Sequence, residues 1–300
     1  MSTMTPPRAP GRAFTPPPAP SKLRETIGML AVTFAFALAV VLADANWPRL
    51  LEAPAILSEF VVLMTQGVLQ NPLEDPTSGY WTRSLELMIE SLHIAWIGTL
   101  IGAILSFPLG FLAARNVAPP GVVVVVRQIL NAIRAIPEII FAIAIMLPIF
   151  GLGPLAGALA IGVNSVGTLG KLTSEAIESI DTGPVESARA SGASRWQVIR
   201  YAMVPQVMPE VVAYWLYRFE INIRASAILG VLGAGGIGSI LSALFNIRAW
   251  DRIGVTLAVI IIVTLIIDAI SGSIRHRIIH GATPRGSRKR RALTPEPPPV

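Results

Sequence analysis

Long, uncharged apolar runs dominate the pattern of this chain, and short polar stretches separate them. A helix needs about 20 mostly apolar residues to cross the hydrocarbon core of a bilayer. Six stretches meet or approach that length, so the pattern predicts an all-α polytopic membrane protein with about six transmembrane helices. The predicted helices cover residues 27–45, 87–114, 122–150, 154–175, 205–230 and 253–270.

The first apolar run, residues 27–45, allows two interpretations. The hydrophobic part of a cleavable signal peptide is usually about 7–15 residues long and ends at a small-residue cleavage site. This run is longer, and no sharp site of that kind closes it. Its length therefore favours a transmembrane helix that is retained.

Two glycine-rich segments interrupt the apolar pattern. Gly151-Leu-Gly-Pro154 divides a long uncharged stretch and predicts a tight external turn between the third and fourth helices. Residues 225–247 are also uncharged, but five glycines between positions 230 and 238 disfavour a regular helix. We interpret this segment as a re-entrant or external turn. The alternative is a separate span, which would move the C-terminus to the other side of the membrane.

These elements divide the chain into four regions. They are a proline-rich disordered tail (1–26), a first helix with an external segment and an interfacial helix near 54–69 (27–83), a transmembrane core that carries a polar loop at 181–205 (84–273), and a basic tail (274–300).

Composition and charge restrict the class further. Charged residues make up 14% of the chain, about half the usual share of a soluble domain. The absence of cysteine excludes disulfides and cysteine zinc sites, and three histidines argue against a histidine metal cage.

The net charge of +6 would suit a nucleic-acid-binding protein, but the basic residues flank apolar runs instead. If both termini are cytoplasmic, sixteen basic residues fall in inside segments and four in outside segments. The positive-inside rule therefore predicts that both termini are cytoplasmic.

Small residues repeat every four positions in the second predicted helix, at Gly98, Gly102, Ser106 and Gly110. They share one helix face, and small residues there allow the backbone of a neighbouring helix to approach closely. We interpret this stripe as a packing surface.

Ionisable residues inside the predicted spans are costly and usually face a partner or a cavity. Arg134 and Glu138 flank Pro137 and stand four residues apart, so we expect them to pair along one helix face. The fifth helix carries a second cluster, and Asn164 stands alone in the fourth. Such groups line a transport pathway or cross-link a bundle, and the surplus of arginine fits an anionic solute. The candidates for the pathway wall are Arg134, Glu138, Asn164, Glu220, Asn222 and Arg224, with Arg218 in the same cluster as the last three.

Two patterns that suggest an enzyme fail on their context. Residues 233–238 match G-x-G-x-x-G, but a dinucleotide site needs a strand before the motif and an acid about 20 residues beyond it. Here the nearby acid is Asp251, and predicted spans flank the motif. His93 and several serines lie at membrane depth, but no G-x-S-x-G motif accompanies them.

The polar loop at 181–205 predicts two short cytoplasmic helices. Pro184 suits a first helical position and Gly192 suits a left-handed helix stop. Ser194 and Gln197 have the spacing of a capping box that begins the next helix. A compact helix–glycine–helix unit of this kind is suited to dock a soluble partner.

This loop resembles the E-A-A-x-x-x-G-x(9)-I-x-L-P signature of binding-protein-dependent ABC importer permeases. Ser187, Ala202 and Val204 are mild departures from that signature. The resemblance implies a type I importer permease fold in a bacterial inner membrane, a loop that inserts into a groove of an ATPase subunit, and no cofactor or ATP hydrolysis in this chain. The residues that it assigns to coupling are Glu186, Ala188, Gly192, Ala193 and Pro205.

Further motifs between residues 84 and 273 are similar to phosphonate and phosphite importer permeases. They are Arg134-Ala-Ile-Pro-Glu138, Gly151-Leu-Gly-Pro-Leu-Ala-Gly157, Gly170-Lys-Leu172, Phe219-Glu-Ile-Asn-Ile-Arg224 and Gly233-Ala-Gly-Gly-Ile-Gly238. Methionine importer permeases share a Gly-Ala-Gly-Gly element but not the Phe-Glu-x-Asn-x-Arg run.

The subfamily resemblance implies transport of phosphonate, phosphite or a related phosphorus oxyanion. The implied partners are two ATPase subunits, a periplasmic binding protein and a second copy of the permease, with no nucleic acid. An outer gate is expected at Gly233, Gly235, Gly236 and Gly238. The alternatives are a permease for another small nutrient, such as methionine, and a membrane scaffold that transports nothing.

Overall fold

A computed structural model describes residues 22–43, 47–70 and 77–280, and the ordered elements within those residues are all helices. In chain order they are α1 (Lys22–Leu42), α2 (Arg49–Thr65), η1 (Gln66–Gln70), α3 (Thr77–Ala113), α4 (Pro120–Ala135), α5 (Glu138–Phe141), η2 (Ala142–Met146), α6 (Leu147–Phe150), α7 (Pro154–Glu178), α8 (Thr182–Ala190), α9 (Arg195–Gln197), η3 (Val198–Met203), α10 (Val204–Leu229), η4 (Gly230–Ala234), α11 (Ile237–Ile247) and α12 (Trp250–His280). The predicted all-α class is confirmed.

Five helices are long and apolar enough to cross a membrane, and the number rises to seven if each of two bent helix pairs is one span. They include α1, α3, α7 and α12, as the sequence predicts. Residues 49–69 also qualify, where the sequence predicts an interfacial helix. The side of the membrane on which the termini lie stays a prediction.

The chain forms two compact units, residues 1–58 and 59–300. In the first unit the Trp47 indole N–H donates to the carbonyl of Val40, 3.2 Å away, which ties the residues after α1 back to it. Most of the two predicted tails lies outside the described residues, although α1 already begins at Lys22 and α12 continues to His280.

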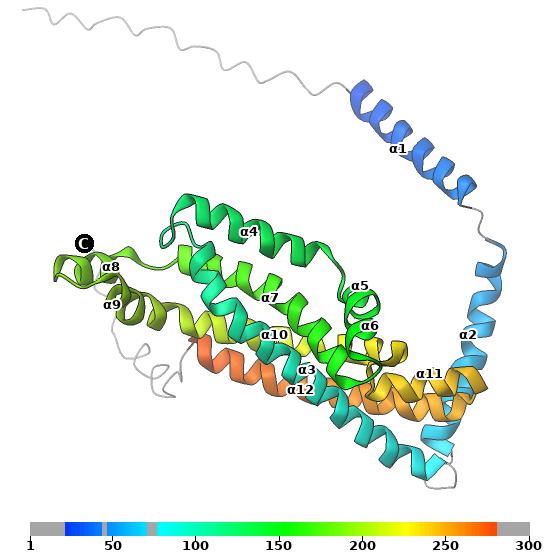
Figure 1. The fold of residues 1–300 in the computed structure, drawn as a ribbon. Helices are drawn as coiled ribbons and strands as arrows, with labels where there is room; N and C mark the ends of the chain where they lie inside the picture. The colour runs from blue at the N-terminus through cyan, green and yellow to red at the C-terminus, as the bar shows by residue number, and fades with distance from the viewer. Residues whose placement is uncertain (1–21, 44–46, 71–76, 281–300) are drawn as a thin grey trace, which may run out of the picture. The chain divides into compact units, whose positions relative to one another are not determined.

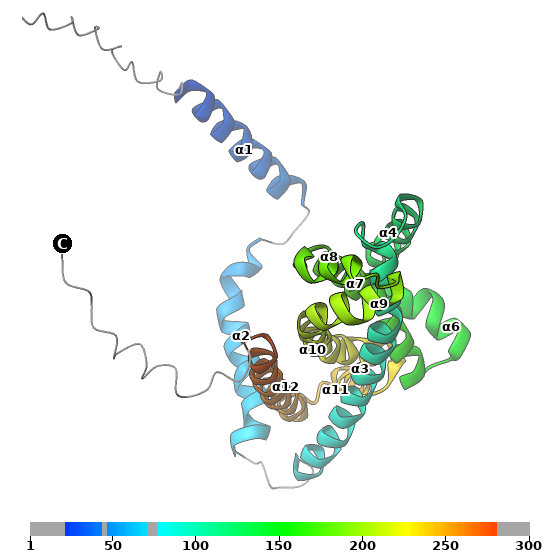
Figure 2. The same ribbon diagram turned by 90° about the vertical axis from the view of Figure 1, so that its left-hand side faces the viewer.

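In the second unit α3 packs along α7, and α10 contacts α3, α7 and α12 (Figure 1). The short helices α8 and α9 lie at one end of this bundle, and α11 lies at the other. Figure 2 views the bundle from the end that carries α8 and α9, with α10 between α12 and α3.

The glycine stripe of α3 packs against α7, as predicted. A Cβ atom added at residue 98 would lie 2.7 Å from Cγ2 of Ile161, and one at residue 110 would lie 2.5 Å from Cγ2 of Thr173. Gly102 abuts Ser165 in the same way. The absence of side chains at these three positions allows the close approach of the two helices.

The prediction of one helix over residues 122–150 is wrong. α4 ends at Ala135, Ile136 is extended (φ −95°, ψ 118°), and the helix that resumes at Glu138 is bent from α4 by 87°. Proline disfavours a helical conformation of the residue before it and supplies no N–H to the preceding turn. Pro137 therefore divides this apolar stretch rather than merely bending it.

The segment 225–247 combines a turn with a regular helix. α10 runs through η4 into Gly235 and Gly236, whose φ values are 78° and 67°, and α11 then leaves at an angle of 59°. Glycine adopts such positive φ angles without strain. The expected glycine turn is present, but it is shorter than predicted, because residues 237–247 are helical.

Candidate functional site: the coupling loop and the intramembrane polar network

The loop between α7 and α10 has the helix–glycine–helix structure that its sequence predicts. Gly192 has a φ of 81°, and the N–H of Ala193 donates to the carbonyl of Ala188, 3.1 Å away. The capping box is present, with Ser194 N–H donating to Gln197 Oε1 at 2.8 Å and Gln197 N–H donating to Ser194 Oγ at 3.4 Å. These interactions fix the turn between α8 and α9.

The start of α8 differs slightly from the prediction. Asp181 is the N-cap residue, and its carboxylate accepts a hydrogen bond of 3.0 Å from the N–H of Gly183. Pro184 is therefore the third residue of the helix rather than the first. The cap stabilises the same helix, which begins two residues earlier than expected.

An apolar cluster holds the loop against the bundle. Val185, Val198, Ala202 and Met203 are buried together, and Phe111 at the end of α3 packs against them. α8 and η3 share this cluster, and η3 leads into α10 without a break.

The predicted coupling residues lie in two places, on α8 with the turn that follows it and at the start of α10. Glu186 and Gly192 are exposed, and Ala188 and Ala193 are half-buried beside them. Trp196 and Tyr201, which the sequence analysis did not select, add apolar surface, with exposed fractions of 70% and 69%. Pro205 is the second residue of α10.

The exposed face around the Gly192 turn carries a shallow pocket, which is lined by Ala188, Ser191, Gly192, Ala193, Gln197 and Tyr201.

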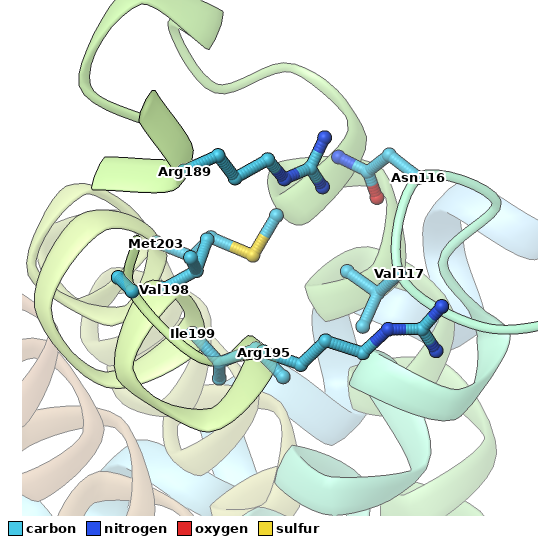
Figure 3. Close-up of a pocket in the computed structure, with 8 residues that line it drawn as sticks. Asn116, Val117, Arg189, Arg195, Val198, Ile199 and Met203 are labelled. Carbon is cyan, nitrogen blue, oxygen red and sulfur yellow. The ribbon is translucent and has the colours of Figure 1, made fainter. Parts of the chain in front are cut away.

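A second pocket, of about 440 Å³, separates this loop from the connection between α3 and α4 (Figure 3). Arg189 and Arg195 both extend across it, Arg189 toward Asn116 and Arg195 toward Val117. Neither arginine forms an ion pair within the described part of the chain. The α3–α4 connection is itself anchored, because Asn116 Nδ2 donates to the carbonyl of Ile177 at 2.7 Å.

A buried polar network lies in the middle of the bundle, around Arg218 of α10. Its Nη2 donates to Asn164 Oδ1 at 2.5 Å and its Nε donates to Ser165 Oγ at 3.0 Å, both on α7. Nη2 also lies 3.4 Å from Oε2 of Glu138. The expected pairing of Arg134 with Glu138 is therefore wrong, because the break at Pro137 ends the helix that would align them.

Asn164, the isolated polar candidate of the fourth predicted helix, has partners on two other elements. Its Nδ2 donates to the carbonyl of Ile136 at 3.1 Å, at the break between α4 and α5. A helix end inside a membrane must satisfy its free backbone groups within the protein. Asn164 thus connects a free carbonyl at the break to the guanidinium of Arg218.

Asn222 extends the network to α3. Its side chain is fully buried, and Nδ2 donates to Thr99 Oγ1 at 2.8 Å and to Ser165 Oγ at 3.1 Å. The network, defined as Arg218, Glu138, Asn164, Ser165, Asn222 and Thr99, therefore joins α3, α5, α7 and α10.

Glu220 and Arg224, also on α10, bind α12 instead. Glu220 lies 3.2 Å from Arg275, and Arg224 lies 2.8 Å from Asp268. The guanidinium of Arg275 also lies over the ring of Tyr217, 5.8 Å from its centroid. These two ion pairs, which we call the α10–α12 brace, are separate from the network.

The six candidates for the pathway wall are thus separated by the fold. Glu138, Asn164 and Asn222 meet around Arg218, whereas Glu220 and Arg224 form the brace. Arg134 is exposed at the end of α4, where its aliphatic stem lies against Gly167. Sequence reasoning missed Ser165 and Thr99 as partners because isolated hydroxyl residues in a helix carry no signal of their own.

The glycines expected to form an outer gate connect two turns. The N–H of Gly153, in the turn before α7, donates to the carbonyl of Gly233 at 2.9 Å. Ser91 of α3 accepts a 2.9 Å hydrogen bond from the N–H of Ile237, the first residue of α11. Gly236 abuts Ser91, which leaves no room for a side chain there.

The second unit is thus a helical bundle with a broken apolar span and an exposed helix–glycine–helix loop at one end. Residues 106–280 match the model of the family described as binding-protein-dependent transport system inner membrane component. The chain belongs to this family of ABC importer permeases, which are transport subunits rather than enzymes and work with an ATPase and a substrate-binding protein.

Two relatives and one solved structure illustrate the similarity. The chain is 40% identical, over 83% of its length and 88% of the relative, to the phosphite transport system permease protein PtxC of Stutzerimonas stutzeri. It is 40% identical, over 63% of its length, to the phosphate-import permease protein PhnE of Mycolicibacterium smegmatis, of which it spans 36%. Its fold is similar to a chain of the inward-facing MetNI methionine ABC transporter, with a TM-score of 0.60 at 24% identity over 68% of this chain and 99% of that one.

Proposed function

We propose that this permease carries a phosphorus oxyanion, such as phosphite, phosphonate or phosphate, across a bacterial inner membrane. The main support is the 40% identity to a phosphite permease over most of both chains. The buried arginine of the network is consistent with an anionic solute. The likeness to the methionine transporter concerns the fold alone and does not favour methionine.

In this proposal the exposed face of α8 and the Gly192 turn docks on the ATPase. Glu186, Ala188, Gly192 and Ala193 supply the contact, and Trp196 adds apolar area to it. The shared cluster around Val185 and Met203 would pass ATPase closure on to η3 and α10, with Pro205 at the start of α10. Exposed aromatic residues beside a small-residue turn are typical of a protein interface.

The assembly would contain two copies of the permease, two ATPase subunits and one periplasmic binding protein. Both termini and the loop at 181–205 would be cytoplasmic, and residues 84–273 would form the transport core. The turn that contains Gly233 and Gly236 would then face the binding protein as an outer gate, at the end of the bundle opposite α8 (Figure 1). Arg134 and the network would face the pathway.

Reconstituted uptake tests the proposed function. The permease, its ATPase and its binding protein are incorporated into liposomes, and uptake of phosphite, methylphosphonate, phosphate and methionine is measured with ATP inside. We expect ATP-dependent uptake of at least one phosphorus oxyanion and none of methionine. Uptake of methionine alone would overturn the choice of solute, and failure to copurify with an ATPase would favour a scaffold.

A further inference from the structure

The polar network contains far more hydrogen-bond donors than anionic groups. Arg218, Asn164, Ser165, Asn222 and Thr99 contribute one guanidinium, two amides and two hydroxyls. Glu138 is the one carboxylate in contact with Arg218 among the described residues. A buried cation that has one carboxylate and otherwise neutral partners is suited to bind an anion in place of that carboxylate.

The guanidinium of Arg218 is held mainly by neutral groups. Its bonds to Asn164 and Ser165 are 2.5 and 3.0 Å long, whereas its contact with Glu138 is 3.4 Å long. Charge-assisted hydrogen bonds from arginine to a carboxylate usually measure about 2.7–2.9 Å. The shorter bonds that hold the guanidinium therefore come from neutral side chains of α7.

Glu138 is the more accessible partner. Its side chain is 26% exposed, compared with 9% for Arg218. It also begins α5, the helix that follows the 87° break, whereas Arg218 lies inside the continuous helix α10. A change of angle at this break would withdraw Glu138 while α7 and α10 still hold Arg218.

We propose that Arg218 recognises the anionic solute during transport and that Glu138 occupies the same guanidinium when the solute is absent. This inference rests on the proposed function. Leaving a buried charge without a counter-ion is costly. Exchange of one anion for another avoids that cost, because Arg218 stays neutralised in both states. The flat fork of a guanidinium also matches two oxygens of a phosphorus oxyanion.

Four variants of the assembled transporter, in nanodiscs and without the binding protein, test this exchange. The readouts are the thermal stabilisation caused by millimolar phosphite and, after reconstitution, ATP-dependent uptake. We expect R218Q to abolish the phosphite-induced stabilisation and to reduce uptake at least tenfold. R218K keeps the charge without the fork and should bind phosphite more weakly than wild type. E138Q removes the competing anion, so half-maximal stabilisation should need several-fold less phosphite.

Arg224→Gln is the matched control, because it removes a charge from the same helix but from the α10–α12 brace. It should keep the phosphite concentration for half-maximal stabilisation, even if its melting temperature falls. Equal phosphite binding by R218Q and wild type would overturn the proposal, as would weaker phosphite binding by E138Q. If R218Q does not assemble, the other two variants still test the proposal. R218K should raise the phosphite concentration for half-maximal stabilisation, and E138Q should lower it. Failure of the wild type to import any phosphorus oxyanion would instead overturn the proposed function.

Discussion

Glu220 and Asn222 stand two residues apart on α10 but bind different helices. Glu220 forms an ion pair of 3.2 Å with Arg275 on α12, whereas the amide of Asn222 donates to Thr99 on α3 at 2.8 Å. At 3.6 residues per turn, two positions differ by about 200°, so the two side chains leave nearly opposite sides of the helix. One polar run in the sequence thus forms two separate interactions, one that braces α12 and one that joins the network.

Removal of one ion pair of the α10–α12 brace should lower the stability of the transporter without weakening its recognition of the solute. Glu220→Ala leaves Arg275 without its carboxylate, and we expect the transporter to lose roughly 1–3 kcal/mol of stability. Phosphite-induced stabilisation should persist, because Arg218 and Glu138 are untouched. Thermal denaturation in detergent measures both quantities on one sample.

Glu220→Gln is the control for the shape of the side chain, since it keeps the volume and removes the charge. Its melting temperature should lie between those of wild type and the alanine variant. A melting temperature unchanged in both variants would show that the pair contributes nothing to stability. Loss of phosphite binding in either one would place Glu220 in the pathway after all.

The division of these polar residues between the network and the α10–α12 brace could not be predicted from the sequence. Membrane depth and charge identify Glu220, Asn222 and Arg224 as residues that need partners, but the partners lie far along the chain. Asp268 and Arg275 belong to the last helix, and Thr99 to α3. Which side of α10 meets which helix depends on the packing of four helices, and no local pattern encodes it.

Close packing of α3 on α7 gives the second prediction. Gly98→Ala places a Cβ 2.7 Å from Cγ2 of Ile161, a distance that forces the helices to shift. Overpacking of this kind usually costs about 1–3 kcal/mol. We expect a corresponding fall in the melting temperature of the transporter.

A double variant separates the steric cause from other effects of Gly98→Ala. Ile161→Ala removes the nearest atom that the new methyl would meet and leaves the Ala158 carbonyl oxygen and Cβ of residue 161 at 3.0 Å, so G98A should cost less in that background. Gly121→Ala, where no atom lies within 4 Å of the added Cβ, should be nearly neutral. Equal costs of G98A in the two backgrounds would exclude the contact with Cγ2 of Ile161 as the cause.

The turn at Gly192 gives the third prediction, which concerns coupling. Its φ of 81° is unfavourable for most residues, and no atom lies within 4 Å of an added Cβ. Gly192→Asp therefore adds backbone strain without a steric clash, and it places a negative charge on the proposed docking face. We expect reduced copurification with the ATPase and at least a tenfold loss of uptake.

Gly192→Asn controls for that strain, because asparagine tolerates the left-handed conformation and carries no charge. It should retain more ATPase than the aspartate variant. Wild-type assembly and uptake in Gly192→Asp would contradict the assignment of this loop to coupling.

Unlike the network, the coupling loop could be predicted almost completely from its sequence. Its structure depends on contacts between near neighbours, such as the reciprocal hydrogen bonds of Ser194 and Gln197. The helix that was wrongly predicted over residues 122–150 involves a contact that is not local. Pro137 lies at the break, but the side chain that binds the free carbonyl of Ile136 there is Asn164, which belongs to another helix.

The absence of cysteine from the whole chain makes a direct test of topology possible, and this is the fourth prediction. Single cysteines at the exposed positions Ser191, Asn246 and Arg49 can be labelled in intact cells or inverted vesicles with a membrane-impermeant maleimide. The positive-inside count predicts that S191C reacts only in inverted vesicles and N246C only from outside. The cysteine-free parent is the blank.

Labelling at residue 49 then decides how α2 meets the membrane. Residues 49–69 are long and apolar enough to cross it, yet the sequence predicts that they lie along the outer surface. With the core oriented as above, R49C should react from outside if α2 lies on that surface, and from inside if α2 crosses. An inside signal would place the N-terminus outside and contradict the prediction that both ends are cytoplasmic. The assignment of the loop at 181–205 to the cytoplasmic side would still stand, because labelling of S191C tests the side of that loop separately.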